Sequence, residues 1–192
     1  MNKVGLFFGS FNPIHIGHLI IAEYIVEHTD LDEVWFVISP NNPLKQKKTL
    51  LNEHQRYYMV QVAIENDSRF KACDVEFKLP RPSFTSITLL KLNELYPNKN
   101  FSIIMGEDNL QSIEKWKNYE FILKNYPIYV YPRAGYECTK EYGQAEIIKV
   151  GAPRIELSAT MIRESVRAGK NVRYCMPPAV CKYIEDMNLY KK

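Results

Sequence analysis

Short apolar runs alternate along the chain with longer stretches in which apolar residues recur every three or four positions. Each run predicts a buried strand, and the runs cover residues 4–8, 34–39, 101–105, 128–131 and 147–150. Helical spacing occurs at residues 17–28, at 52–65, and from 83 or 85 to just before Pro97, where proline cannot continue a helix. This alternation predicts an α/β fold with helices on both faces of a parallel sheet.

The last third of the chain has a different pattern. Ser158 is placed to cap a helix that closes at Gly169, and the pair Pro177-Pro178 opens a final helix that ends near Asn188. We therefore expect a Rossmann-like, doubly wound parallel sheet of about five or six strands, followed by a small helical part that begins at about residue 157.

Composition limits the choice of partners. A chain of 192 residues can bury a sizeable core, so we expect a single domain over residues 1–192. Its 25 basic and 22 acidic residues leave a net charge of only +3, which favours neither nucleic acid nor an anionic membrane as a partner.

The four cysteines lack C-x-x-C spacing, and the sequence has no apolar stretch typical of a signal peptide or a membrane span. A cytoplasmic location is expected.

The segment after the first predicted strand carries the strongest chemical signal. Residues 9–18 read Gly-Ser-Phe-Asn-Pro-Ile-His-Ile-Gly-His, so a glycine, two histidines and a helix start follow a strand, where phosphates bind. The string matches neither the Walker motif nor the dinucleotide-binding glycine motif. Gly9 would supply a tight turn, and His15 and His18 would supply charge held by adjacent phosphates. Alternatives are two capping or core histidines, or a zinc site.

The wider string G-S-F-x-P-x-H-x-G-H-L resembles the signature of nicotinate-nucleotide adenylyltransferases, members of the H-x-G-H nucleotidyltransferase superfamily. Four further pieces follow in the order of that family, at residues 40–45 (P-N-N-P-L-K), 83–85 (S-F-T), 106–108 (G-E-D, with Trp116 after it) and 157–163 (L-S-A-T-M-I-R). The resemblance implies transfer of the adenylyl group of ATP to nicotinate mononucleotide, which gives deamido-NAD and pyrophosphate in NAD biosynthesis. Mg²⁺ would accompany ATP, with no metal ligand from the protein.

Motif and chemistry together give the candidate site residues. The catalytic candidates are His15, His18 and Arg163, the ATP-binding candidates are Gly9, Ser10, Phe11, Gly17, Lys45, Gly106, Asp108, Ser158 and Thr160, and the pyridine-nucleotide candidates are Thr85 and Trp116. Ser158 and Thr160 at a helix start would cradle an anion, and Arg163 offers a fork that matches phosphate oxygens. Gly106 would let a nucleotide approach the backbone, and Asp108 would accept a ribose hydroxyl.

Trp116 stands between Lys115 and Lys117, which indicates a partly exposed ring that can stack on a pyridinium. In the family, such a tryptophan and the threonine of an S-Y-T segment frame the pyridine ring. Here Phe84 replaces the tyrosine, and Asn12 replaces the usual aspartate of the first loop. Both changes keep the shape of the side chain but weaken any inference about fine substrate preference.

Two alternatives to this function stay open. One is another member of the superfamily, such as a nicotinamide mononucleotide or phosphopantetheine adenylyltransferase. The other is a nucleotide-binding module without turnover. The combination of His15, His18 and Arg163 favours an enzyme, and Thr85 with Trp116 favours a pyridine nucleotide. ATP and nicotinate mononucleotide are the expected partners, and a homodimer is one of the open oligomeric states.

Overall fold

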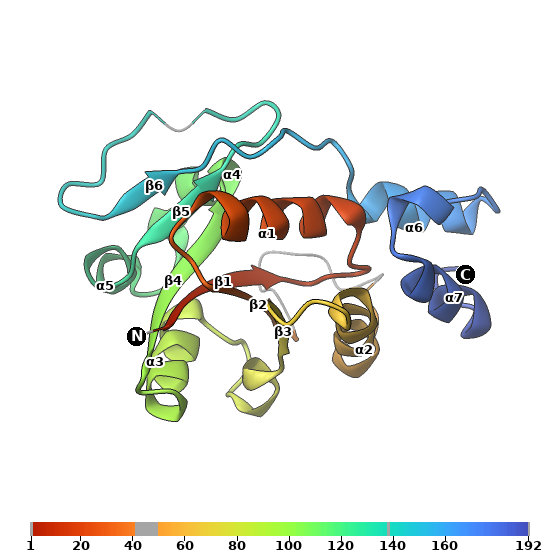
Figure 1. The fold of residues 1–192 in the computed structure, drawn as a ribbon, viewed down its shortest axis with the longest axis horizontal. Helices are drawn as coiled ribbons and strands as arrows, with labels where there is room; N and C mark the ends of the chain where they lie inside the picture. Colours follow the sequence, from red (N-terminus) through yellow and green to blue (C-terminus); the bar gives the residue numbers. More distant parts are fainter. Residues whose placement is uncertain (1, 41–49, 138, 192) are drawn as a thin grey trace.

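A parallel sheet forms the centre of the computed structural model, which describes residues 2–40, 50–137 and 139–191 (Figure 1). Within these ranges the sheet has six strands in the order β3-β2-β1-β4-β5-β6, and each strand runs parallel to its neighbours. The strands are β1 (Asn2–Gly9), β2 (Glu33–Ile38), β3 (Phe70–Cys73), β4 (Lys99–Gly106), β5 (Ile128–Tyr131) and β6 (Ile147–Lys149). The predicted doubly wound, Rossmann-like α/β fold is confirmed.

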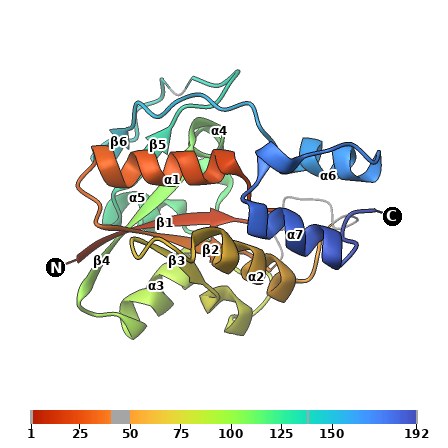
Figure 2. The ribbon, with the colours of Figure 1, turned by 45° about the vertical axis from the view of Figure 1, so that its right-hand side comes forward.

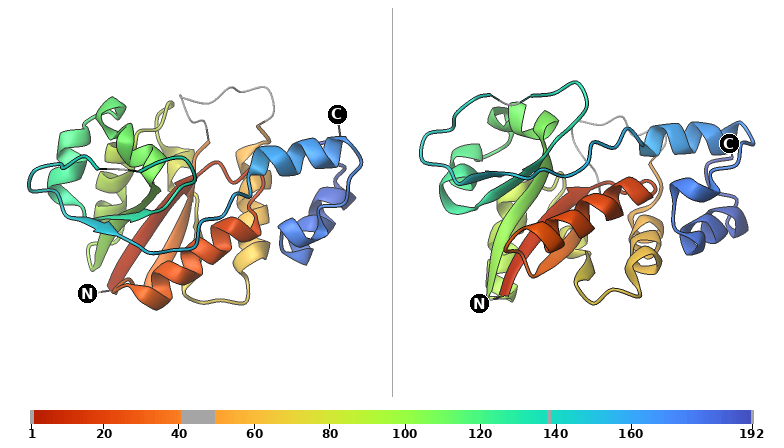
Figure 3. Two further views of the ribbon diagram at one scale, coloured as in Figure 1. Left: turned by 90° about the horizontal axis from the view of Figure 1, so that it is seen from above. Right: turned by 45° about the horizontal axis from the view of Figure 1, so that its top comes forward.

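Helices cover both faces of this sheet. Figure 2 shows α1 (Ile16–His28) on one side of the strands and α3 (Thr85–Leu95) on the other. The other α-helices of the described ranges are α2 (Glu53–Ile64), α4 (Glu107–Gln111), α5 (Tyr119–Asn125), α6 (Ala159–Arg167) and α7 (Pro178–Asp186). In both views of Figure 3, α6 and α7 lie together at the far end of the molecule from β6. None of the helices in the described ranges is long and apolar enough to cross a membrane.

Two apolar clusters, one on each face, hold the layers together. Neighbouring strand residues point to opposite faces: Phe7 and Phe36 pack in one cluster with α1, α2, α6 and α7, whereas Leu6 and Trp35 pack in the other with α3 and α5. Because both faces are covered, the central strands are apolar at successive positions rather than at alternate ones. This is why they are visible in the sequence as continuous runs.

Most predicted element boundaries agree with the structure to within one or two residues. The predicted cap is present, since Ser158 Oγ accepts a hydrogen bond of 3.2 Å from the Met161 N–H at the start of α6. Gly169 follows that helix in the left-handed conformation, with φ of 69°. Sequence reasoning missed β3, α4 and α5, which have only four, five and seven residues. Segments of that length do not complete a periodic pattern.

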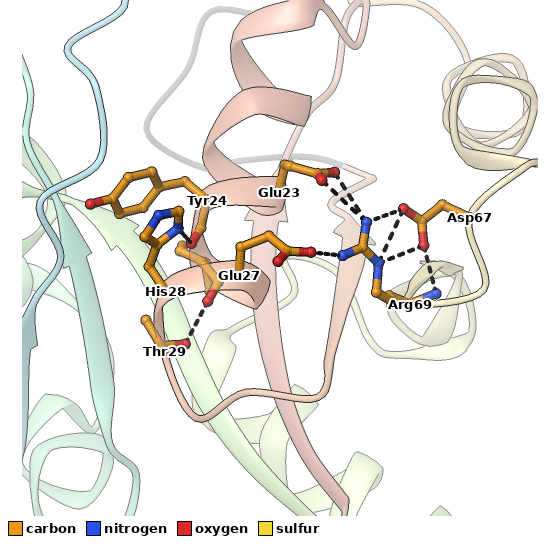
Figure 4. A network of polar contacts seen from close by, with 8 residues as sticks. Glu23, Tyr24, Glu27, His28, Thr29, Asp67 and Arg69 are labelled. Atoms are coloured by element: carbon orange, nitrogen blue, oxygen red, sulfur yellow. Dashed lines mark hydrogen bonds and ion pairs between the residues drawn. The ribbon is translucent and has the colours of Figure 1, made fainter.

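A charged network joins α1 to the turn between α2 and β3 (Figure 4). The guanidinium of Arg69 binds the carboxylate of Asp67 at 2.6 Å and that of Glu23 at 3.2 Å, and it also pairs with Glu27. These carboxylates hold the pKa of Arg69 above its usual value, mainly through the hydrogen bonds that Arg69 donates to Asp67. All four side chains are partly solvated, so water and salt screen these pairs and they contribute little to stability.

Candidate active site

The carboxyl ends of the strands open onto a cavity of about 780 Å³. Its walls include the loops after β1, β2 and β4 and the segment that leads into α6. Of the site residues predicted from the sequence, the structure brings together in its lining Gly9, Ser10, Phe11, His15, Gly17, His18, Thr85, Asp108, Trp116, Ser158, Thr160 and Arg163. Lys45 lies outside the described residues, and Gly106 is not among the described residues that line the cavity.

His15 and His18 form a stacked pair at the start of α1. Their ring centroids are 3.7 Å apart, and the backbone N–H of His15 donates a hydrogen bond of 3.2 Å to Nδ1 of His18. A nitrogen that accepts a hydrogen bond carries no proton, so in this arrangement the ring proton of His18 is on Nε2. The site thus holds one histidine with a defined tautomer and an N–H donor.

Burial controls the charge of His15, which is only 5% exposed. The pKa of His15 is lowered to about 4, mainly because burial removes solvation from the charged ring and secondly because Arg133 carries a positive charge. Within the described residues, its Nδ1 atom is buried and has no hydrogen-bond partner. The imidazole is therefore neutral at neutral pH in this structure. The positive charge expected from the sequence would appear only if phosphates next to the ring raised the pKa.

Two glycines of the first loop are required by packing. A Cβ on Gly9 would lie 2.7 Å from the ring of Phe11, and one on Gly17 would lie 3.0 Å from Nδ1 of His15. The left-handed residue of the loop that follows is Phe11, with φ of 44°. The Phe11 side chain is only 2% exposed and packs in the core.

Gly106 also differs from its expected role. A Cβ there would lie 2.4 Å from Oδ1 of Asp108 and 2.8 Å from Cγ of Arg133, so protein side chains fill the space that was expected to admit a nucleotide. Asp108 and Arg133 approach to 3.5 Å, and the Arg133 N–H donates to Glu107 at 3.1 Å. Arg133 lines the cavity and was missed in the sequence. Arg133 could have been found from its position just after β5, because ligands bind at the carboxyl ends of parallel strands.

Arg163 links α6 to the loop after β1. Its Nη1 group donates to the carbonyl of Asn12 at 2.8 Å, and its Nη2 group donates to the hydroxyl of Thr160 at 3.1 Å. Ser158 caps the same helix. The cation predicted from the S-x-T-x-x-R pattern is thus held beside the histidine loop, although the two are far apart in the sequence.

Thr85 and Trp116 stand at another part of the cavity wall. Thr85 is the first residue of α3, and Trp116 follows a short 3-10 turn, η3 (Ile113–Lys115). Trp116 is partly exposed, as its polar neighbours indicated. The ammonium of Lys117 lies 4.5 Å from the centre of the Phe84 ring, so the two segments are in contact. This end of the cavity offers a flat aromatic surface beside the start of a helix.

Glu76 is a buried carboxylate of the cavity wall that sequence reasoning missed. It lies in the 3-10 turn η2 (Val75–Lys78), and it accepts hydrogen bonds from the hydroxyls of Ser83 at 2.7 Å and Thr88 at 2.8 Å. Burial raises its pKa, although these hydroxyl hydrogen bonds oppose the shift. Glu76 therefore fixes the backbone on either side of Thr85.

The structure lends no support to a zinc site. Among the described residues, no group of three or more His, Cys, Asp or Glu side chains could hold a metal ion. His28 stacks on Tyr24 with a centroid distance of 4.0 Å, and His54 packs against Phe77 at 5.2 Å. Both histidines thus have local packing partners away from the histidine pair.

Known proteins resemble this chain over nearly its full length. A family model described as cytidylyltransferase-like matches residues 6–165. A probable nicotinate-nucleotide adenylyltransferase of Flavobacterium johnsoniae is 52% identical over 192 residues, which cover 99% of this chain and all of the relative. The chain belongs to the nicotinate-nucleotide adenylyltransferase family. A probable member from Bacteroides fragilis is 44% identical and covers 95% of this chain and 90% of its own length.

Solved structures agree with the fold of this family. A nicotinic acid mononucleotide adenylyltransferase of Plasmodium falciparum, complexed with NaAD, superposes with a TM-score of 0.80 at 21% identity and covers 99% of this chain and 98% of its own. The predicted resemblance to nicotinate-nucleotide adenylyltransferases is confirmed, and with it the prediction of a nucleotidyltransferase of NAD biosynthesis. The alternative of a binding module without turnover is not supported.

Proposed function

We propose that this cavity transfers the adenylyl group of ATP to the phosphate of nicotinate mononucleotide. The observation that carries the proposal is that one cavity is lined both by cationic or N–H donors (His15, His18 and Arg163) and by an aromatic ring, Trp116, beside Thr85. A phosphate oxygen of the mononucleotide forms a bond to the α-phosphorus of ATP. The bond from that phosphorus to the oxygen bridging to the β-phosphorus breaks, and pyrophosphate leaves with the electron pair.

The attacking group needs no general base. A phosphate monoester has a second pKa of about 6, so most of it is a dianion at neutral pH. Catalysis then consists of in-line positioning and of stabilising the charge on the transferred phosphoryl group and the leaving pyrophosphate. His18 would donate from Nε2, Arg163 would offer its remaining N–H groups, and His15 would gain charge when phosphates arrive. Ser158, Thr160 and the start of α6 add donors for phosphate oxygens.

A divalent metal bound to the triphosphate is part of the proposed reaction. The family uses ATP, and ATP-dependent nucleotidyl transfer generally needs a divalent metal. Mg²⁺ keeps several waters and binds substrate phosphates rather than an all-protein cage, which suits a cavity whose described donors are mainly histidine, arginine and hydroxyl groups. When bound to the triphosphate, Mg²⁺ would neutralise part of its charge.

The other end of the cavity suits the pyridine nucleotide. Stacking on Trp116 would hold the ring, and the N–H groups at the start of α3, with Thr85, would favour the anionic nicotinate over the neutral amide. Asp108 would accept a ribose hydroxyl, and Lys45 is proposed to approach the phosphates. We expect the enzyme to act in the cytoplasm.

Pyrophosphate release tests this function directly. ATP and Mg²⁺ are combined with nicotinate mononucleotide, nicotinamide mononucleotide or phosphopantetheine, and the released pyrophosphate is measured. We expect kcat/KM for nicotinate mononucleotide to exceed that for the amide by at least about tenfold, or ~1.4 kcal/mol. Turnover with phosphopantetheine alone, or no turnover with any acceptor, would contradict the proposal. Equal values for acid and amide would remove the preference and leave the reaction class intact.

A further inference from the structure

A fully buried arginine lies behind the loops that form the phosphate end of the cavity. Arg56 of α2 is 0% exposed. Its guanidinium donates to four backbone carbonyls, those of Ser10 at 2.6 Å, Ser39 at 2.9 Å, Pro40 at 3.2 Å and Leu51 at 3.0 Å. Backbone carbonyls from three separate segments therefore meet at one side chain.

Arg56 has no ion-pair partner among the described residues. The acidic side chain one helical turn before it, Glu53, pairs instead with Arg81 at 2.6 Å. Burial lowers the pKa of Arg56 to about 10, which still leaves the guanidinium charged at neutral pH. A buried cation without a carboxylate is costly to desolvate, and an apolar side chain of similar volume would avoid that cost. The place of its four carbonyl partners therefore matters for what this charge does.

The carbonyl partners of Arg56 belong to cavity residues. Ser10 and Ser39 both line the cavity, and the Ser39 N–H also bonds to the Gly9 carbonyl at 2.9 Å. The guanidinium thus joins the end of β2 to the loop after β1 from the side away from the cavity. Movement of this side chain would move the backbone on which phosphates are proposed to bind.

A chain of hydrogen bonds also connects Arg56 to the catalytic candidate Arg163. Arg56 donates to the carbonyl of Leu51, and the N–H of Leu51 donates to Oδ1 of Asn12 at 3.3 Å. The carbonyl of Asn12 then accepts from Arg163 at 2.8 Å. Two arginines therefore hold the same loop: Arg163 bonds to Asn12 directly, and Arg56 bonds to Ser10 directly and is linked to Asn12 through Leu51.

We propose that Arg56 is a positioning residue of the nucleotidyl-transfer site, which holds the loop after β1 and the end of β2 in place and keeps a fixed positive charge behind the phosphates. It touches no substrate and acts through Ser10, Ser39 and Asn12. This inference rests on the proposed function for its kinetic test, while its binding test needs only ATP.

The test compares R56K and R56Q with the matched control R69K. Arg69 also makes several hydrogen bonds, but its partners belong to the surface network of Figure 4, away from the cavity. A lysine has three N–H donors on a single nitrogen, so it cannot replace the four hydrogen bonds that the planar guanidinium donates to these carbonyls. We expect R56K and R56Q to lower kcat per folded site by about tenfold or more and to weaken ATP binding, with KM for the mononucleotide within about threefold. R69K should lose thermal stability but keep kcat and ATP affinity.

Two results would contradict the positioning role of Arg56. Active-site concentration is measured by titration, and folding by circular dichroism and thermal unfolding. Values of kcat per site and ATP affinity within about twofold of the parent in R56K would overturn the positioning role. Failure of both Arg56 variants to fold where R69K folds would overturn it too, because Arg56 would then support the whole fold. If the parent itself does not use nicotinate mononucleotide, the proposed function fails, and ATP affinity measured by calorimetry still decides the role of Arg56.

Discussion

Acid should destabilise this protein through His15. The pKa of this residue is about 4 in the folded chain and 6.5 in the unfolded chain, because burial and Arg133 disfavour the charged ring. A lowered folded-state pKa means that the unfolded chain takes up the proton first. The stabilisation is therefore complete above about pH 6.5, and it is lost as the pH falls towards about pH 4. A gap of about 2.5 pH units corresponds to ~3 kcal/mol at 1.36 kcal/mol per unit.

Urea unfolding of the parent and of His15→Gln at several pH values in this window measures the effect. Carboxylates that titrate in both proteins cancel in the difference between the two unfolding free energies. That difference should change by ~3 kcal/mol across the window, with the parent losing stability faster on acidification. Parallel stability curves for the two proteins would refute the assigned burial of His15. Calorimetry of ATP binding in buffers of different ionisation enthalpy should also show proton uptake near pH 5 to 6, since phosphates raise the pKa of this ring.

Three further substitutions test other parts of the structure. His18→Ala should fold and bind ATP, but its single-turnover rate should fall by about 10²–10³, as for loss of one preorganised donor; a rate within about threefold of the parent would exclude that role. Trp116→Ala should raise KM for the mononucleotide by about tenfold with little change in kcat, because stacking stabilises ground and transition states alike. If this variant instead loses its cooperative unfolding transition, the ring serves the core. Arg69→Ala should lower the unfolding free energy slightly at low salt and by less at high salt, with activity unchanged; an effect that is independent of salt would rule out an electrostatic origin.

The parts of the fold that could be predicted are those whose pattern is local. The central strands are continuous apolar runs because they are buried on both faces, and the helices α1, α2, α3 and α6 are long enough to show their period. The cavity could be located because the carboxyl ends of parallel strands meet at one edge. The edge strand β3 and the short helices α4 and α5 carry no such signal.

Residues that act on backbone atoms were beyond the reach of sequence reasoning. Arg56 is a charged residue of α2, a type that is usually solvated, and its partners are carbonyls that leave no mark in the sequence. The surroundings of Gly9 and Gly106 were hidden for a related reason. The sequence shows where a side chain is missing, but only the structure shows that Phe11 and Asp108 lie closest to that position.

The hydrogen bond of 2.8 Å from the Tyr190 hydroxyl to Oδ1 of Asn12 spans 178 positions of the sequence. Domains fold while the chain is still being synthesised, yet this bond forms only after α7 has left the ribosome. A chain that stops ahead of α7 would lack the Tyr190 partner of Asn12, and it would also lack Val180 and Ile184, which belong to the apolar cluster on one face of the sheet.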